Sequence, residues 1–215
     1  EYRSKTGELI NLKGETYAAE EYSYDHEGNI TLIRFLDTEL NPCGNKNSVG
    51  EIQSEYANGD LISNTYFTKD GKRGHRIDYT YNDRHELISV AYYGAENQPM
   101  LSSDNYFKML YEYDARGNVA QELYLGVNGK EIKCFLGFST AVYTYDNRGN
   151  RISECYFDIE GRPTCSREGY YKIQRTYDDA WNLVSTQQWR LVPGMNLKEE
   201  KTLDSHSRAI SVKYY

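Results

Sequence analysis

Tyr143-Thr-Tyr-Asp-Asn-Arg-Gly-Asn150 is a motif that recurs as Tyr111-Glu-Tyr-Asp-Ala-Arg-Gly-Asn118 and as Tyr22-Ser-Tyr-Asp-His-Glu-Gly-Asn29. Its Asp suits the first corner of a tight turn, where the side chain accepts bonds from the backbone N–H groups that follow. Its Gly suits the corner that needs a positive φ. The motif therefore predicts two antiparallel strands joined by a type I turn and a left-handed residue.

The spacing of this motif predicts a tandem repeat. Successive copies of its second Tyr are separated by 32, 25, 32, 32, 32 and 26 residues, so a unit of about 32 residues recurs and two copies are shorter. The anchor positions are Tyr24, Tyr56, Tyr81, Tyr113, Tyr145, Tyr177 and a degenerate Leu203.

Apolar and aromatic residues alternate on both sides of each turn. Met109, Tyr111 and Tyr113 are spaced to share one face of a strand, as are Ala141, Tyr143 and Tyr145. We expect equivalent tyrosines of neighbouring repeats to form cross-strand ladders. The predicted fold is all-β, with tandem β-hairpin repeats of about 32 residues forming one elongated or spiralling antiparallel sheet.

A second turn follows three of the hairpins and ends at Pro42, Pro99 and Pro163, with the next anchor 14 residues further on in each case. The seventh residue before an anchor is often aromatic, which predicts a third strand or a packed bridge between hairpins. The residues with this position are Tyr106, Phe138 and Tyr170.

The chain is expected to be a single repeat array over residues 1–215, with about six hairpin repeats over roughly 20–190 and an atypical C-terminal copy over 191–215. Trp181 replaces the turn Gly of its repeat, and Trp189 and 192–194 lead into the weaker copy. His85 also stands where other copies have Gly, so we expect strain in its backbone. Because the chain begins at Glu1, we expect it to be part of a longer protein.

Charge and composition argue against several classes of partner. The chain has 25 basic and 32 acidic residues, a net charge of -7, which argues against nucleic acid and anionic membrane. It has no apolar stretch long enough for a membrane-spanning segment, so membrane insertion is not expected. The oligomeric state stays open.

No cofactor, metal site or catalytic site is expected. The histidines show no metal-ligand spacing, and Cys155 has no His nearby in sequence to act as a base. Cys134 and Cys165 lie 31 residues apart, so stacked repeats could bridge them, although buried free thiols are the alternative. We therefore predict a protein that is not an enzyme.

Aromatic rows are the candidate binding residues, because Tyr combines apolar area with a hydroxyl that suits sugars and protein partners. The alternative is that the same rows form the core of the sheet. The candidate residues are Tyr92, Tyr93, Tyr111, Tyr113, Tyr143, Tyr145, Tyr156, Trp181 and Trp189.

The Tyr-Asp-x-x-Gly core resembles the YD repeats of bacterial Rhs-like proteins and of teneurins over roughly residues 20–190. The matching positions are Tyr24-Asp25 with Gly28, Tyr113-Asp114 with Gly117, and Tyr145-Asp146 with Gly149, while Tyr177-Asp178 lacks its Gly. The resemblance implies hairpins in a spiralling β-sheet and a cell-surface or secreted location. This chain departs from that family in its Asn after the Gly, its longer repeat and its few copies. A weaker resemblance is to the choline- and glucan-binding repeats of surface proteins.

Two functions follow as expectations. The first is a non-catalytic, extracellular or cell-surface module that presents a Tyr-rich β-sheet to a protein or glycan partner. The alternative is a scaffold or shell fragment of a larger Rhs-like protein whose enzymatic domain lies outside this chain.

Overall fold

A computed structural model describes residues 1–191, 197–203 and 209–214, and all regular secondary structure in these residues is β-strand. The prediction of an all-β fold is confirmed. The strands are β1 (Ala19–Tyr24), β2 (Ile30–Leu36), β3 (Val49–Ala57), β4 (Asp60–Thr68), β5 (Arg73–Tyr81), β6 (Leu87–Tyr93), β7 (Lys108–Tyr113), β8 (Val119–Leu125), β9 (Thr140–Tyr145), β10 (Arg151–Phe157), β11 (Lys172–Tyr177), β12 (Leu183–Trp189), β13 (Leu197–Leu203) and β14 (Ala209–Tyr214).

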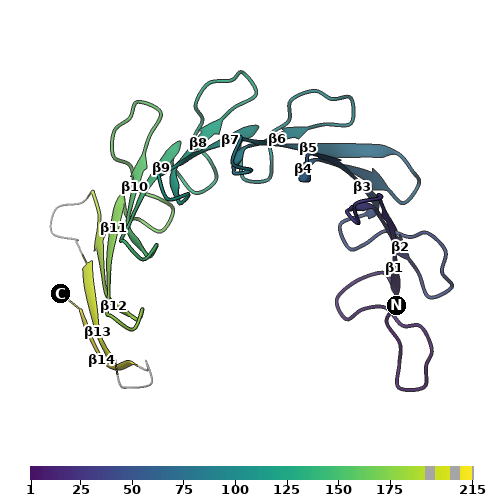
Figure 1. Cartoon of the computed structure of the whole chain (residues 1–215), viewed down its shortest axis with the longest axis horizontal. Coiled ribbons are helices and arrows are strands. Elements are labelled where there is room, and N and C mark those ends of the chain that lie inside the picture. Colours follow the sequence, from purple (N-terminus) through teal and green to yellow (C-terminus); the bar gives the residue numbers. More distant parts are fainter. Residues whose placement is uncertain (192–196, 204–208, 215) are drawn as a thin grey trace. The chain divides into compact units, whose positions relative to one another are not determined.

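The chain divides into two compact units, Glu1–Met100 with strands β1 to β6 and Leu101–Tyr215 with strands β7 to β14. Within each unit the strands follow one another across the sheet in chain order, and neighbours are antiparallel (Figure 1). Tandem antiparallel hairpins are thus confirmed as the building block. A single array over residues 1–215 stays a prediction.

Each full motif forms the predicted turn, and its Asn proves to be part of it. In the turn of β9 and β10, Asp146 Oδ1 accepts bonds from the backbone N–H groups of Arg148 and Asn150, both at 2.9 Å. The Asn150 side-chain amide donates to Asp146 Oδ2 at 2.9 Å. Gly149 has a φ of 86°. The same bonds recur around Asp25, Asp114 and Asp178, so the Asp–Asn pair closes each of these turns.

In the turn of the motif, two residues take the left-handed conformation where other copies have Gly. His85 has a φ of 59° and Trp181 a φ of 70°, in a region that L-residues with large side chains disfavour. The predicted backbone strain at His85 is confirmed. Its ring Nδ1 lies 2.7 Å from Asp60 Oδ2 across the hairpins of the first unit.

The segment between hairpins contains two turns. After β8, a turn spans residues 126–130, an isolated bridge pairs Leu125 with Glu131, and a further turn spans 134–138. The third strand predicted as one alternative does not form between β8 and β9, and the connecting segment is instead an isolated bridge and two turns that pack on the sheet. The short copy between Tyr56 and Tyr81 has only one turn between β4 and β5, at 68–72, which accounts for its missing residues.

Aromatic pairs between these connecting segments and the sheet form the core. The ring centroids of Phe138 and Tyr156 lie 4.5 Å apart in a stacked arrangement, and those of Tyr106 and Tyr124 lie 5.0 Å apart. Tyr124 also contacts Phe138 at 5.9 Å, so these four rings form one continuous row. A row of this kind buries one face of the second unit's sheet beneath its own connecting segments.

All four cysteines are free thiols. Cys134 is buried, as the free-thiol alternative predicted, and Cys165 is half-buried. Since both are unbridged, the disulfide alternative for this pair is wrong in this structure.

The C-terminal copy is described in part. Strands β13 and β14 pair as a hairpin whose register shifts between Thr202 and Leu203, as it does at Tyr113 in the hairpin of β7 and β8. Leu203 therefore occupies the predicted anchor position. Residues 192–194 lie outside the described residues.

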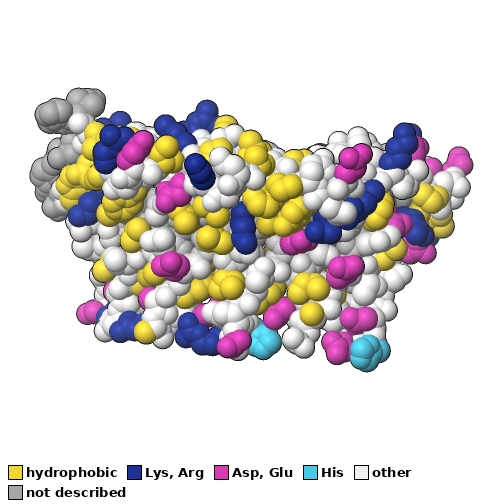
Figure 2. Space-filling view, turned by 90° about the horizontal axis from the view of Figure 1, so that it is seen from above, with side chains coloured by type: hydrophobic (Ala, Val, Ile, Leu, Met, Phe, Trp, Pro, Cys, Tyr) yellow, Lys and Arg dark blue, Asp and Glu magenta, His cyan; other side chains and the backbone are white. Residues whose placement is uncertain are grey.

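Acidic, basic and hydrophobic side chains are interspersed on the face shown in Figure 2. No helix of sufficient length and apolarity to cross a membrane occurs in the described part of the chain.

Candidate binding site

One face of strands β8 to β11 brings together side chains from different repeats. Antiparallel pairing places Glu122 of β8 opposite Ala141 of β9, and Glu154 of β10 opposite Tyr143 of β9. Because side chains alternate along a strand, both glutamates and Tyr143 project from the same face. The cluster that follows is therefore a direct result of strand register.

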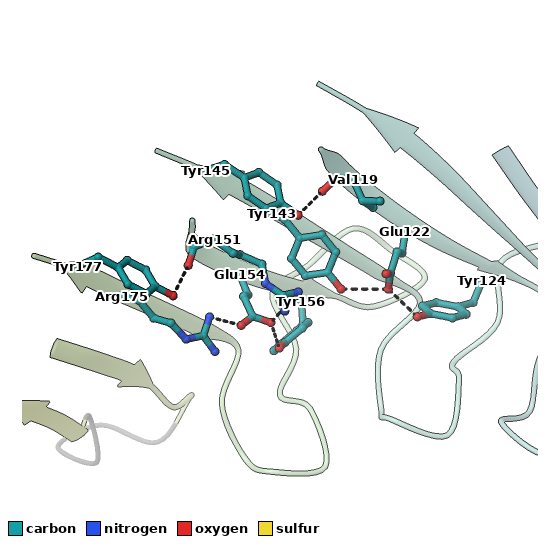
Figure 3. A network of polar contacts seen from close by, with 10 residues as sticks. All are labelled: Val119, Glu122, Tyr124, Tyr143, Tyr145, Arg151, Glu154, Tyr156, Arg175 and Tyr177. Atoms are coloured by element: carbon teal, nitrogen blue, oxygen red, sulfur yellow. Dashed lines mark hydrogen bonds and ion pairs between the residues drawn. The ribbon is translucent and has the colours of Figure 1, made fainter. Parts of the chain in front are cut away.

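Glu122 joins two tyrosines from neighbouring hairpins. The hydroxyls of Tyr124 and Tyr143 both donate to Glu122 Oε2, at 2.8 and 3.0 Å (Figure 3). Burial raises the pKa of both tyrosines, and the adjacent Glu122 carboxylate raises it further. These hydroxyls therefore stay protonated as donors at any physiological pH.

Glu154 is a buried carboxylate held by charged and neutral donors. Only 6% of the residue is exposed, and Tyr156 donates its hydroxyl to Oε2 at 2.9 Å. The Arg175 guanidinium donates to Oε1, while Arg151 Nη1 lies at a longer 3.8 Å from Oε2 (Figure 3). A buried carboxylate with several donors is satisfied in place, so Glu154 has a fixed position.

Two arginines cover aromatic rings at the rim of this cluster. The Arg151 guanidinium lies 4.8 Å from the centre of the Tyr143 ring, and that of Arg167 lies 3.7 Å from the centre of the Phe135 ring. Both distances are in the range of cation–π contacts. The Arg151 side chain is nevertheless 44% exposed, so it reaches solvent from the edge of the cluster.

A pocket of about 350 Å³ lies over the cluster, between the sheet and the turn at 166–170. Glu122, Glu154, Arg151 and Arg175 line it from the sheet, and Leu136 lines it from the neighbouring turn. A pocket of this size matches the lower end of the range for small-ligand sites.

A second pocket of about 340 Å³ lies one repeat earlier. Tyr106 and Tyr124 take the places that Phe138 and Tyr156 have in the first, 32 residues later. Both pockets are lined by Glu122 and Leu136. The site is thus repeated along the second unit, in keeping with the repeat of the sequence.

Of the candidate aromatics, only Tyr143 and Tyr156 line the first pocket, over Glu122 and Glu154, and both are buried. Tyr145 fastens the repeats instead, because its hydroxyl donates to the Val119 carbonyl at 2.8 Å. Tyr177 makes the equivalent bond to the Arg151 carbonyl at 3.4 Å. These two tyrosines therefore have a structural role.

The other candidates lie apart from the pocket. Tyr92 and Tyr93 end strand β6 in the first unit, and Tyr111 and Tyr113 are half-buried on β7. Trp181 is exposed in a turn, and Trp189 is half-buried at the end of β12 with Lys172 Nζ 4.9 Å from its ring. Their roles in binding stay predictions.

The charged residues of the pocket are absent from the sequence-based candidates. A signal for two of them exists, because Glu122-Leu-Tyr124 and Glu154-Cys-Tyr156 repeat the pattern Glu-x-Tyr at the 32-residue spacing. No such pattern marks Arg151 or Arg175, whose proximity to Glu154 depends on strand pairing. No group of His, Cys, Asp and Glu suited to a metal ion occurs in the described residues.

No protein-family model matches the chain, and no curated protein matches its sequence. Among solved structures, the crystal structure of TcdB2-TccC3 without its hypervariable C-terminal region is 15% identical, with a TM-score of 0.45, over 91% of this chain and 10% of that chain. A Photorhabdus luminescens Tc holotoxin pore is 13% identical, with a TM-score of 0.37, over 97% of this chain and 13% of that one. The chain spans about a tenth of the length of these structures. The fold makes this chain a tandem β-hairpin repeat protein. Sequence identities and TM-scores this low do not identify its family.

Proposed function

We propose that this chain is a non-catalytic binding module, surface-exposed or secreted, that presents the pocketed face of its second unit to a protein or glycan. The observation that carries the proposal is the recurrence of one pocket at the repeat spacing. Repeat proteins use such recurring surfaces for binding, whereas a catalytic site needs a specific, non-repeating constellation.

The bonding of the carboxylates supports a role without catalysis. Glu154 is bound by Arg175 and Tyr156, and Glu122 accepts from two tyrosine hydroxyls. A general acid or base has to exchange a proton with its substrate, and both carboxylate oxygens of Glu154 are already bonded to its neighbours. The rim, with the exposed Leu136 and Arg151, is the part left for a ligand to contact.

Parallel glycan and surface-protein arrays probed with the labelled chain would test this function. We expect binding that is abolished by the double variant Leu136→Asp/Arg151→Glu and kept by Val127→Asp. Val127 is a matched control because it is 52% exposed on a turn of the same unit and does not line either pocket. Binding that the double variant leaves intact, or no binding on either array, would contradict the proposal. Cleavage of a bound glycan would contradict its non-catalytic part.

A second candidate function is a scaffold or shell segment of a larger protein. Its support is that connecting turns of successive repeats bond to each other as well as through the sheet: Phe135 N–H donates to the Asp104 carbonyl, and Arg167 N–H to the Leu136 carbonyl, both at 2.7 Å. Repeats that are bonded both through the sheet and through their connecting turns form a rigid layer, as a scaffold requires. The native gene product decides this candidate, because a scaffold requires a further domain beyond these 215 residues.

A further inference from the structure

We infer that the two pockets of the second unit are adjacent subsites for one uncharged, extended glycan chain. The inference rests on the proposed function and names its ligand class. Its starting point is that the pockets share two lining residues, Glu122 and Leu136, so a ligand that leaves one pocket enters the other.

The polar groups at the border of the pockets suit sugar hydroxyls. Both bonds to Glu122 go to Oε2, which leaves Oε1 to accept a further hydrogen bond. Arg175 holds Glu154, so the more distant Arg151 guanidinium has N–H groups to donate. A hydroxyl both donates and accepts, and neighbouring hydroxyls on a sugar ring can satisfy Glu122 and Arg151 together.

Leu136 supplies the apolar part of the site. It is 49% exposed on the turn at 134–138, and it lines both pockets. The carbon-bound hydrogens of a sugar ring form an apolar face that can cover such a side chain. The border therefore offers an apolar surface beside a donor and an acceptor, the usual composition of a small-ligand site.

The repeat spacing fits an extended polymer. Each repeat contributes two strands to the sheet, and adjacent strands lie about 4.8 Å apart, so equivalent pockets are separated by roughly 9.5 Å. A β-linked glycan in an extended conformation presents the same face again after every second sugar ring, a length of the same order. Equivalent rings can therefore occupy equivalent pockets without bending the chain.

The charges of the lining favour an uncharged glycan over an acidic one. The later pocket is lined by three arginines and three glutamates, so its charges balance. The earlier one is lined by Asp104 and Glu122 with no basic residue among those described. A uronic acid in the earlier pocket would meet like charges at close range, which disfavours its binding.

Calorimetric titration of the full chain with cello-, laminari- and N-acetylchito-oligosaccharides, each from monomer to hexamer, would test the inference. We expect affinity for one series to rise with length until the ligand spans both pockets. Loss of a hydrogen bond to a charged group weakens binding by about tenfold, which is the effect expected for Glu122→Gln and for Arg151→Gln. Glu112→Gln and Arg162→Gln, at residues outside both pockets, are the controls and should bind normally.

Each outcome bears on one statement. If no series binds, or an oligo-uronate binds more tightly, the inferred ligand class is wrong, while the protein array still tests the proposed function. If a glycan binds to both pocket variants with the affinity it has for the unmodified chain, the subsites are wrong, and the array experiment with Leu136→Asp/Arg151→Glu then decides the proposed function separately. Arg151 is exposed, so its variant should fold even if Glu122→Gln does not.

Discussion

At the scale of single residues, Trp181 has a backbone conformation that its side chain disfavours, and Glu154 has a charged side chain in a buried place. Trp181 has a φ of 70° in the turn between β11 and β12, where three other motif copies have Gly, and its side chain is 59% exposed. Little packing offsets this strain. Glu154 is the opposite case, a buried carboxylate whose cost is met by Arg175, Arg151 and Tyr156.

Trp181→Gly is expected to raise the free energy of unfolding by about 0.5–1 kcal/mol, because relief of the left-handed strain outweighs the greater freedom of Gly in the unfolded chain. Urea unfolding followed by circular dichroism would measure it. Ala180→Gly in the same turn, where φ is not positive, is the control and should lower stability slightly. Equal effects of the two substitutions would argue against strain at Trp181.

Glu154→Leu is expected to destabilise the fold by about 3 kcal/mol, because it leaves the Arg175 charge partly buried without its carboxylate. Adding Arg175→Met should recover most of that loss, since two apolar side chains of similar volume can replace a buried ion pair. The free energies of unfolding of both variants, from urea titration, give the coupling. A double variant no more stable than Glu154→Leu would show that the pair is not the source of the effect.

At the scale of the element, the five-residue turn is the unit on which the hairpin depends. Its Asp is hydrogen-bonded by the Asn side chain and two backbone N–H groups, and these bonds lower the pKa of Asp114, Asp146 and Asp178 below the usual value. In each, the Asn side chain is the largest cause. The carboxylate form therefore belongs to the folded turn.

A pH dependence follows from these lowered pKa values. An unfolded Asp has a pKa of about 3.9, so between that value and the lower folded pKa the unfolded chain binds more protons. The stabilisation is complete above pH 5 or so and is lost as the pH falls through the folded pKa values. Urea midpoints from pH 6 to pH 2 should therefore fall less in the triple variant Asp114→Asn/Asp146→Asn/Asp178→Asn, whose amides keep an acceptor oxygen. An unchanged acid response would contradict this role of the turns.

At the scale of the whole molecule, the second unit is a stack of equivalent layers. Tyr145 and Tyr177 make the same bond to the preceding hairpin, and the connecting turns bond in the same way from repeat to repeat. Stability in such arrays is roughly the sum of each repeat and its nearest neighbours. Removal of one complete layer should then leave the others intact.

Deletion of residues 114–145 joins Tyr113 to Asp146 and removes one repeat of 32 residues, so every remaining turn keeps its register. We expect a folded protein with an unchanged circular dichroism spectrum per residue and a smaller denaturant m-value, which scales with the surface exposed on unfolding. Deletion of 114–129, half a repeat, is the control and should disrupt the sheet. Equal damage from the two deletions would contradict a modular array.

The sequence by itself determined the hairpins, their turns and their period. These depend on local chemistry: Asp and Gly set the turn, alternation sets the strand, and repetition makes each hairpin alike, so the prediction held even for the degenerate anchor Leu203. Strand alternation also placed Tyr143 and Tyr145 on one face correctly.

Only the tertiary structure decided which residues meet across repeats. Glu122 reaches Tyr143, and Glu154 reaches Arg175, because strand pairing brings side chains 21 residues apart in the sequence onto neighbouring positions of one face in both cases. It also showed that the connecting segment folds over the aromatic face, which buries Tyr143 and Tyr156 and leaves the rim to Arg151 and Leu136. The residues of a turn do not predict these contacts, because the contacts form only when neighbouring hairpins pack against each other.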